Sequence, residues 1–156
     1  MISFYRPQID DLWFRRQLLA DPETMSYNHA WGGTIQFSRD RWQDWYDLWV
    51  ASSSTERFYR YVAVNNGHDY VGEAAWHYDK ERDLWLIDVI IHSKFRHQGY
   101  GRAALELLCD EAGKNGITAL HDDIAIDNPS ISLFMKCGFA EEYRTDQFVM
   151  LRKDLK

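Results

Sequence analysis

One stretch constrains the fold of this chain more than any other: an apolar run, a loop with two glycines, and then an amphipathic helix. Residues 84–91 are almost continuously apolar, which is typical of a central strand buried on both faces. The loop that follows reads RHQGYG at positions 96–101. Apolar residues then recur at the i, i+3, i+4 and i+7 spacing of a helix, namely Leu105, Leu108, Cys109 and Ala112. The stretch therefore predicts a buried strand that leads through the loop into a helix ended by Gly113 and Gly116.

The rest of the chain alternates between strand and helix patterns. Strands are predicted over 2–6, 58–64, 70–78 and 118–126, with one or two more over 142–152. Helices are predicted over 10–20 and 128–136, and from an N-cap at Ser38 through a helically spaced stripe of core aromatics, Trp42, Trp45, Tyr46 and Trp49. Strands that alternate with helices in the second half imply some parallel pairing, so the predicted class is α/β or mixed α+β.

Composition limits the function classes. A length of 156 residues suggests a single domain, 1–156. The net charge of −6 argues against a nucleic-acid binder and suits a cationic small molecule or a basic peptide, although it also serves plain solubility. The two cysteines form neither a disulfide framework nor a zinc motif, so we expect no metal. No apolar run has the length of a membrane span, and we expect a soluble cytoplasmic protein.

The glycine loop has the chemistry of an anion site. The first turn of a helix leaves backbone N–H groups without partners, and the helix dipole places partial positive charge there. Gly99 and Gly101 lack Cβ atoms, so a bulky anion such as a pyrophosphate could approach the backbone, with Arg96 and Arg102 adding charge nearby. The alternative is a strand-to-helix turn that uses glycine for geometry alone. The loop is neither a Walker loop nor a dinucleotide fingerprint.

Two motifs together resemble a known family. RHQGYG between a strand and a long helix resembles the acyl-CoA signature of the GNAT superfamily of N-acyltransferases. SISLFMKCGF at 130–139 resembles that family's second signature, a short helix that ends in Gly-Phe. The resemblance implies a central mixed, mostly antiparallel sheet with a splayed parallel strand pair, flanked by about four helices. It also implies acetyl-CoA, or another acyl-CoA, as the donor.

The resemblance assigns specific residues to the acyl-CoA. It places the pantetheine arm along one strand and the pyrophosphate on the loop, which gives Val89, Ile90, Ile91, Arg96, His97, Gln98, Gly99, Tyr100, Gly101 and Arg102. Asn128 would contact the cofactor arm, although Asp127 holds the spacing at which the family has its Asn. Phe134 stands where many members have a Tyr that protonates the leaving sulfur, and phenylalanine cannot do this.

Three carboxylates are candidates for the catalytic base. Asp88 interrupts an apolar run, where a carboxylate needs a function or a partner. Glu73 follows Gly72 on a predicted strand and faces either the same groove or solvent. Asp122 shares its alternation phase with Leu120, Ile124 and Ile126, which suggests an inward direction, although Asp123 next to it leaves the strand register open. Water could also relay the proton.

The resemblance implies an acceptor groove built from the first two helices, their connection and the middle strands. The residues expected there are Tyr27, His29, Trp31 and Trp76, beside Glu73 and Asp88. An aromatic and acidic wall suits a protonated amine through cation–π and ion-pair contacts. The same aromatics could equally be a packing cluster.

Three functions fit the sequence. The first is acetyl transfer from acetyl-CoA to a small-molecule amine in a ternary complex. The second is acetylation of protein or peptide N-termini or lysines. The third is an acyl-CoA-binding regulatory module with little turnover, which Phe134 in place of a Tyr keeps open. We expect no nucleic-acid or membrane partner, and a monomer or a homodimer.

Overall fold

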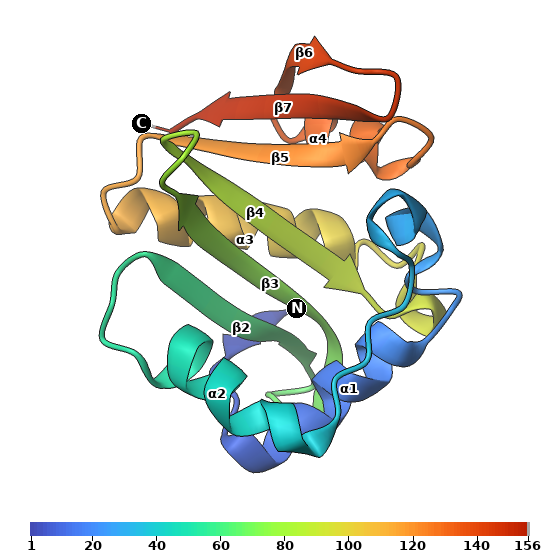
Figure 1. Cartoon of the computed structure of the whole chain (residues 1–156), viewed down its shortest axis with the longest axis vertical. Coiled ribbons are helices and arrows are strands. Elements are labelled where there is room, and N and C mark those ends of the chain that lie inside the picture. The colour runs from blue at the N-terminus through green and yellow to red at the C-terminus, as the bar shows by residue number, and fades with distance from the viewer. Residues whose placement is uncertain (156) are drawn as a thin grey trace.

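A seven-stranded sheet crosses the molecule in the order β1-β2-β3-β4-β5-β7-β6 (Figure 1). The computed structural model describes residues 1–155, with the side chains of Ala30 and Trp31 outside the description. Only β4 and β5 pair in parallel, and the other neighbours are antiparallel. This confirms the predicted mixed, mostly antiparallel sheet. The strands are β1 (Ser3–Tyr5), β2 (Arg57–Val64), β3 (Asp69–Asp79), β4 (Leu84–Ile91), β5 (Ala119–Ala125), β6 (Ala140–Arg144) and β7 (Phe148–Asp154).

Helices cover both faces of the sheet. One face carries α3 and α4, and the other carries α1 and α2; Figure 1 shows α3 behind β3 and β4. The α-helices are α1 (Trp13–Ala20), α2 (Trp42–Tyr46), α3 (Tyr100–Lys114) and α4 (Ser130–Lys136). The shorter helical turns are η1 (Ile9–Leu12), η2 (Ser26–Trp31), η3 (Arg39–Arg41), η4 (Asp47–Ala51) and η5 (Ser93–Phe95).

The helix predicted from Ser38 is broken into η3, α2 and a π-helical turn, η4. Ser38 is the N-cap residue, but its hydroxyl donates to the Asp40 carboxylate rather than capping a backbone N–H. The aromatic stripe does form core, as predicted. Trp42 is buried, and the Trp45 ring meets Tyr59 edge-on at 4.7 Å.

Alternation along β4 divides its side chains between the two faces. Val89 and Ile91 pack with the α3 face, whereas Ile90 packs with the aromatics of the α1 and α2 face. Gly72 on β3 allows β4 to approach, because a Cβ at Gly72 would lie 2.2 Å from the Ile90 carbonyl oxygen. A side chain there would displace the strand that carries the predicted site.

The parallel pair β4 and β5 separates soon after it forms. The only backbone register between them is Leu86 with His121 among the described residues. Beyond that point the strands diverge, so the prediction that β4 is buried on both faces along its whole length is wrong. Leu86 and Ile87 are buried, but Asp88 is exposed in the gap that the divergence opens.

Candidate functional site

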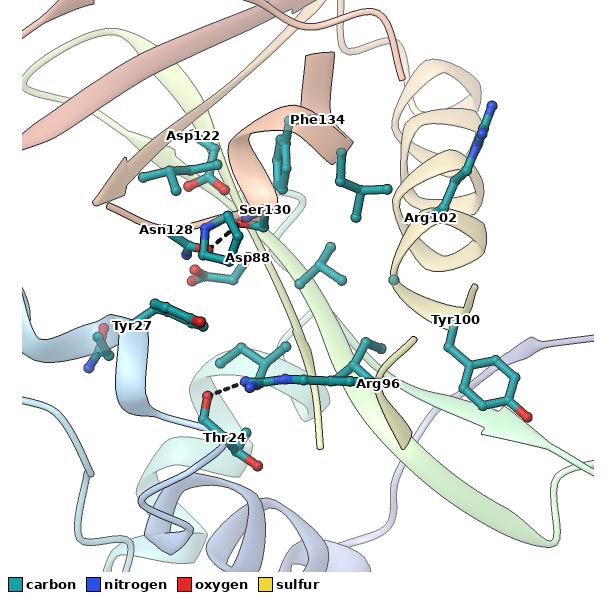
Figure 2. Close-up of a pocket in the computed structure, with 18 of the residues that line it drawn as sticks. Thr24, Tyr27, Asp88, Arg96, Tyr100, Arg102, Asp122, Asn128, Ser130 and Phe134 are labelled. Atoms are coloured by element: carbon teal, nitrogen blue, oxygen red, sulfur yellow. Dashed lines mark hydrogen bonds between the residues drawn. The ribbon is translucent and has the colours of Figure 1, made fainter. Parts of the chain in front are cut away.

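A cavity of about 710 Å³ occupies the gap between β4 and β5 (Figure 2). Its walls come from the two strands, the β4–α3 loop, α4, and the segment that links α1 to η2. Single ligand cavities in proteins commonly have volumes of 300–1,000 Å³. The cavity is therefore large enough for an extended small molecule.

The β4–α3 loop lies at one end of the cavity and presents unpaired backbone donors. No acceptor within residues 1–155 bonds the N–H groups of residues 97–102. His97 and Gly99 have left-handed backbone conformations, with φ of 63° and 84°. This conformation is unusual for a residue with a Cβ and often marks a functional loop. The unpaired N–H groups and the helix dipole together form the anion site that the sequence predicts.

The two glycines serve different purposes. Gly99 has open space where a Cβ would be, so its requirement is the positive φ. Gly101 has an ordinary φ, but a Cβ there would lie 3.4 Å from Leu133 and 3.8 Å from Ile91. The small residue therefore keeps α3 close to α4 at the cavity wall.

The two arginines of the loop are already engaged. Arg96 donates to the Thr24 carbonyl at 2.8 Å and lies over the Tyr27 ring at 5.8 Å. It therefore ties the segment between α1 and η2 to the loop, as Figure 2 shows for Thr24. Arg102 pairs with Glu106 at 2.8 Å on the helix surface. Both line the cavity, whereas Gln98, which was also expected to bind the cofactor, is exposed and does not.

A second connection joins the same two segments. The Asp21 carboxylate accepts from the Ser93 hydroxyl at 2.8 Å and from the Thr24 backbone N–H at 3.1 Å. These bonds lower the pKa of Asp21 to about 2, chiefly through the Thr24 and Ser93 hydroxyls. The end of α1 and the start of the β4–α3 loop are thus held as one unit.

The cavity edge of β4 is suited to an extended polar chain. Val89, Ile90 and Ile91 all line the cavity and are half-buried. Because β5 diverges beyond Leu86, the backbone edge of β4 that faces it has no strand partner there. Such an edge can accept a ligand chain in place of a strand.

Asp88 lies on the cavity floor. Its side chain has no hydrogen bond or ion pair with any described residue, and it reaches the open cavity although protein surrounds it on the other sides. Desolvation by this surrounding protein, followed by the charges of Glu73 and Asp123, raises its pKa to about 7. A carboxylate with a pKa near neutrality is suited to accept a proton from an amine.

Asp122 lies on the opposite wall, on β5. It is only 9% exposed and lines the cavity, and within the described part of the chain it pairs with no other side chain; the Asp123 backbone N–H is the group that acts on its carboxylate as a donor. Burial and then the charge of Asp88 raise its pKa well above the ordinary value. The inward direction that strand alternation predicted is confirmed.

Glu73 faces neither the cavity nor solvent. It is 4% exposed and accepts two hydrogen bonds from Arg15, at 2.5 and 2.8 Å, and one from the Tyr59 hydroxyl. The Arg15 guanidinium also lies over the Trp45 ring at 4.4 Å. The expectation of a solvent-facing or groove-facing Glu73 is wrong, because Arg15 on α1 reaches across and neutralises it.

Helix α4 closes the cavity beside β5. Phe134 lines it, with its ring 5.1 Å from Phe139 and edge-on to it. Asn128 also lines the cavity, where its side-chain oxygen accepts from the Ser130 backbone N–H at 2.9 Å. Asn128 therefore shapes the start of α4, and its amide nitrogen remains the group available to a ligand.

The expected acceptor residues have different positions. Tyr27 lines the cavity at its α1 side. His29 does not line it but pairs with Asp127 at 2.9 Å, which joins η2 to the segment after β5. Trp76 is 3% exposed and stacks on Phe58 at 4.1 Å within the core, so its placement in the groove is wrong. The Trp31 side chain lies outside the described residues.

Several cavity residues had no clear signal in the sequence. Asp123 is one, because its neighbour Asp122 left the strand register ambiguous. The segment before η2 gave no periodic pattern. The cavity residues that the sequence did not indicate are Thr24, Met25, Phe95, Asp123, Ile124, Ala125 and Pro129.

No membrane-crossing or metal feature accompanies the cavity. Within the described residues, no helix has the length and apolarity needed to cross a bilayer. Across residues 1–155, no three His, Cys, Asp or Glu side chains gather closely enough to hold a metal ion. Cys109 and Cys137 are buried and form no disulfide.

The mixed sheet with a splayed parallel pair, the loop of free amides and the adjacent cavity match the arrangement that the two sequence motifs predicted for an acyl-CoA-dependent N-acyltransferase. The acetyltransferase (GNAT) family matches residues 14–139, and the chain belongs to that family. It is accordingly an acetyl-CoA-dependent N-acetyltransferase by class.

Solved structures share the fold across nearly the whole chain. Spermidine N-acetyltransferase from Vibrio cholerae, in complex with CoA and spermine, superposes with a TM-score of 0.81 and 17% identity, covering 98% of this chain and 95% of its own. An N-acetyltransferase from Staphylococcus aureus Mu50 superposes with a TM-score of 0.77 and 17% identity, covering 100% and 99%. No curated protein matches the sequence.

Proposed function

We propose that this protein transfers the acetyl group of acetyl-CoA directly to a primary amine of a small molecule, with both bound at once. The observation that carries the proposal is the position of Asp88, without a partner, on the floor of a cavity whose other end is the free-amide loop. In this arrangement an anion and a protonated amine would be attracted to opposite ends of one space.

The chain's residues fit acetyl-CoA, which supplies the activated acetyl group. The N–H groups of residues 97–102 would hold the pyrophosphate, and the free edge of β4 along Val89–Ile91 would bind the pantetheine arm. An N–H on that edge would donate to the carbonyl oxygen as it gains charge. Asp88 would accept the proton of the attacking amine.

The acceptor side favours a small cation. Asp88 and Asp123 line the cavity, and the Tyr27 ring stands at its α1 side. The pair His29–Asp127 joins η2 to the segment after β5, next to the cavity residues Asn28 and Asn128. The similarity to a spermidine N-acetyltransferase agrees with an amine of this kind.

Phe134 favours a second candidate, an acyl-CoA-binding module with little turnover. Phe134 lines the cavity beside β5, where the resemblance expects a tyrosine, and its ring has no acidic proton to give to the departing thiolate. The module would bind acetyl-CoA and release almost no thiol with any amine.

One experiment separates these functions. The purified protein is mixed with acetyl-CoA and a panel that contains spermidine, spermine, monoamines and peptides with a free N-terminus or lysine, and release of CoA thiol is measured. We expect amine-dependent release with small amines. Release only with peptides would support the alternative acceptor class, and calorimetric binding of acetyl-CoA without release would support the module.

A further inference from the structure

The two unpartnered carboxylates of the cavity lie on opposite faces of the sheet. Asp122 alternates with Leu120 and Ile124, and both of these pack in the core cluster that contains Phe134. Asp88 alternates with Ile90, which packs toward α1 and α2. Only the separation of β4 from β5 lets both carboxylates reach one cavity.

Each carboxylate therefore lies on the side of the cavity that a different reacting group would occupy. Figure 2 shows Asp122 and Phe134 on one side of the cavity, and Asp88 on the side nearer Tyr27. An amine that entered past Tyr27 would meet Asp88. A group that left toward α4 would meet Asp122 and the Phe134 ring, which offers it no proton.

The surroundings of Asp122 favour its protonated form. Burial raises the pKa of Asp122, and the charges of Asp88 and then Asp123 raise it further. Two arginines of the neighbouring carboxylates are engaged there: Arg82 pairs with Asp123 at 3.6 Å, and Arg15 pairs with Glu73. Two carboxyls that line one cavity do not ionise independently, because the charge of one favours the protonated form of the other.

We propose that Asp122 is the proton donor to the departing thiolate, supplying from β5 what Phe134 on α4 cannot supply. The inference rests on the proposed acetyl transfer. The amine attacks in its neutral form, after its ammonium proton has gone to solvent. As its nitrogen bonds to the acyl carbon, the carbon–sulfur bond breaks and its electron pair goes to sulfur. Asp122 gives its proton to that sulfur, while Asp88 takes one proton from nitrogen. Asp88 then loses its proton to solvent and Asp122 regains one, so the charges balance.

The test compares Asp122→Asn with the double variant Asp122→Asn, Phe134→Tyr. Asparagine has nearly the shape of a protonated aspartate but donates no acidic proton. We expect kcat to fall about 100-fold, the scale of general acid catalysis, while calorimetric binding of acetyl-CoA is unchanged. Phe134→Tyr should restore at least tenfold of the loss, because a phenol is then available. Asp154→Asn is the matched control, since its exposed side chain lies on β7 and pairs with Arg152.

The outcomes separate the inference from the proposed function. A wild-type protein that releases no thiol with any amine removes the proposed function, and the inference with it. An active wild type whose Asp122→Asn variant keeps kcat within threefold overturns the inference alone, as does a tenfold or greater loss that Phe134→Tyr does not restore. If Asp122→Asn does not fold, Phe134→Tyr alone decides. A phenol keeps its proton to a higher pH than a carboxyl does. If the pH–rate profile of Phe134→Tyr extends to higher pH than that of the wild type, the inference is supported, and an unchanged profile overturns it.

Discussion

At the scale of single residues, carboxylates of similar appearance in the sequence have different environments. Asp88 and Asp122 form no ion pair among the described residues and line the cavity, whereas Glu73 is neutralised by Arg15. Strand alternation indicated the direction of Asp122. It could not indicate the partner of Glu73, because Arg15 lies 58 residues away in the chain.

Asp88 should give the reaction its pH dependence. Because its pKa is raised to about 7, the fraction able to accept a proton grows as the pH rises through neutrality. We expect kcat/KM to rise between about pH 6 and pH 8, and Asp88→Asn to remove that rise and lower kcat/KM about 100-fold. The same shift lowers the free energy of unfolding as the pH rises from about 4 to about 7, because folded Asp88 binds its proton more tightly than unfolded Asp88 does.

The measurement for Asp88 is a pH–rate profile of the wild type and the variant at several amine concentrations. Acetyl-CoA binding by Asp88→Asn serves as the control and should be unchanged. A variant that keeps the wild-type profile would remove Asp88 from the base role.

Glu73→Gln should damage the fold rather than the chemistry. It leaves the guanidinium of Arg15, whose side chain is 15% exposed, buried without its counter-charge. Breaking a buried ion pair at one partner commonly costs about 3–5 kcal/mol. We expect urea unfolding to show a loss of about that size, with little change in kcat at temperatures where the variant is folded. A normal unfolding midpoint with a large loss of kcat would instead restore Glu73 as a base candidate.

At the scale of elements, the glycines at the two ends of α3 have different structural roles. Gly99 is the N-cap of α3 and has a φ of 84°, whereas Gly113 near the end of the same helix has an ordinary φ and open space around it. The sequence predicted the loop and the helix but not which glycine needs its freedom. That need depends on how β4 meets α3.

Gly99→Ala and Gly113→Ala form a matched pair. Alanine at Gly99 is strained in the left-handed region, by about 1 kcal/mol or more, and would shift the free N–H groups of the loop. We expect at least tenfold weaker acetyl-CoA binding by calorimetry. Alanine at Gly113 should raise stability by about 0.5–1 kcal/mol and leave binding unchanged. Equal binding by the two variants would contradict the role given to the loop.

At the scale of the whole molecule, the cavity joins parts of the fold that are far apart in the chain. Arg96 and Asp21 tie the α1 side to the β4–α3 loop, and His29–Asp127 ties it to the segment after β5. A ligand in the cavity would contact both strands of the splayed pair and these tethered segments, and so would oppose their separation.

Acetyl-CoA should therefore stabilise the folded protein. A ligand at 100 times its dissociation constant adds about 2.7 kcal/mol, which for a chain of this length corresponds to a rise in Tm of roughly 5–10 °C. Thermal melting with and without acetyl-CoA checks this. Sodium acetate, which lacks the CoA moiety, is the control. No change in Tm at saturating acetyl-CoA would contradict a site in this cavity.

By itself, the sequence determined the local features of this protein: the strand before RHQGYG, the helix after it, the class of fold and the anion-binding loop. These follow from periodicity, glycine and unpaired helix amides, which act over a few residues. Tertiary structure alone decided that β4 and β5 separate after Leu86, that Trp76 enters the core, and that Arg15 neutralises Glu73. Each of these depends on which distant segments come into contact, and burial and charge pairing are properties of such contacts rather than of any local pattern.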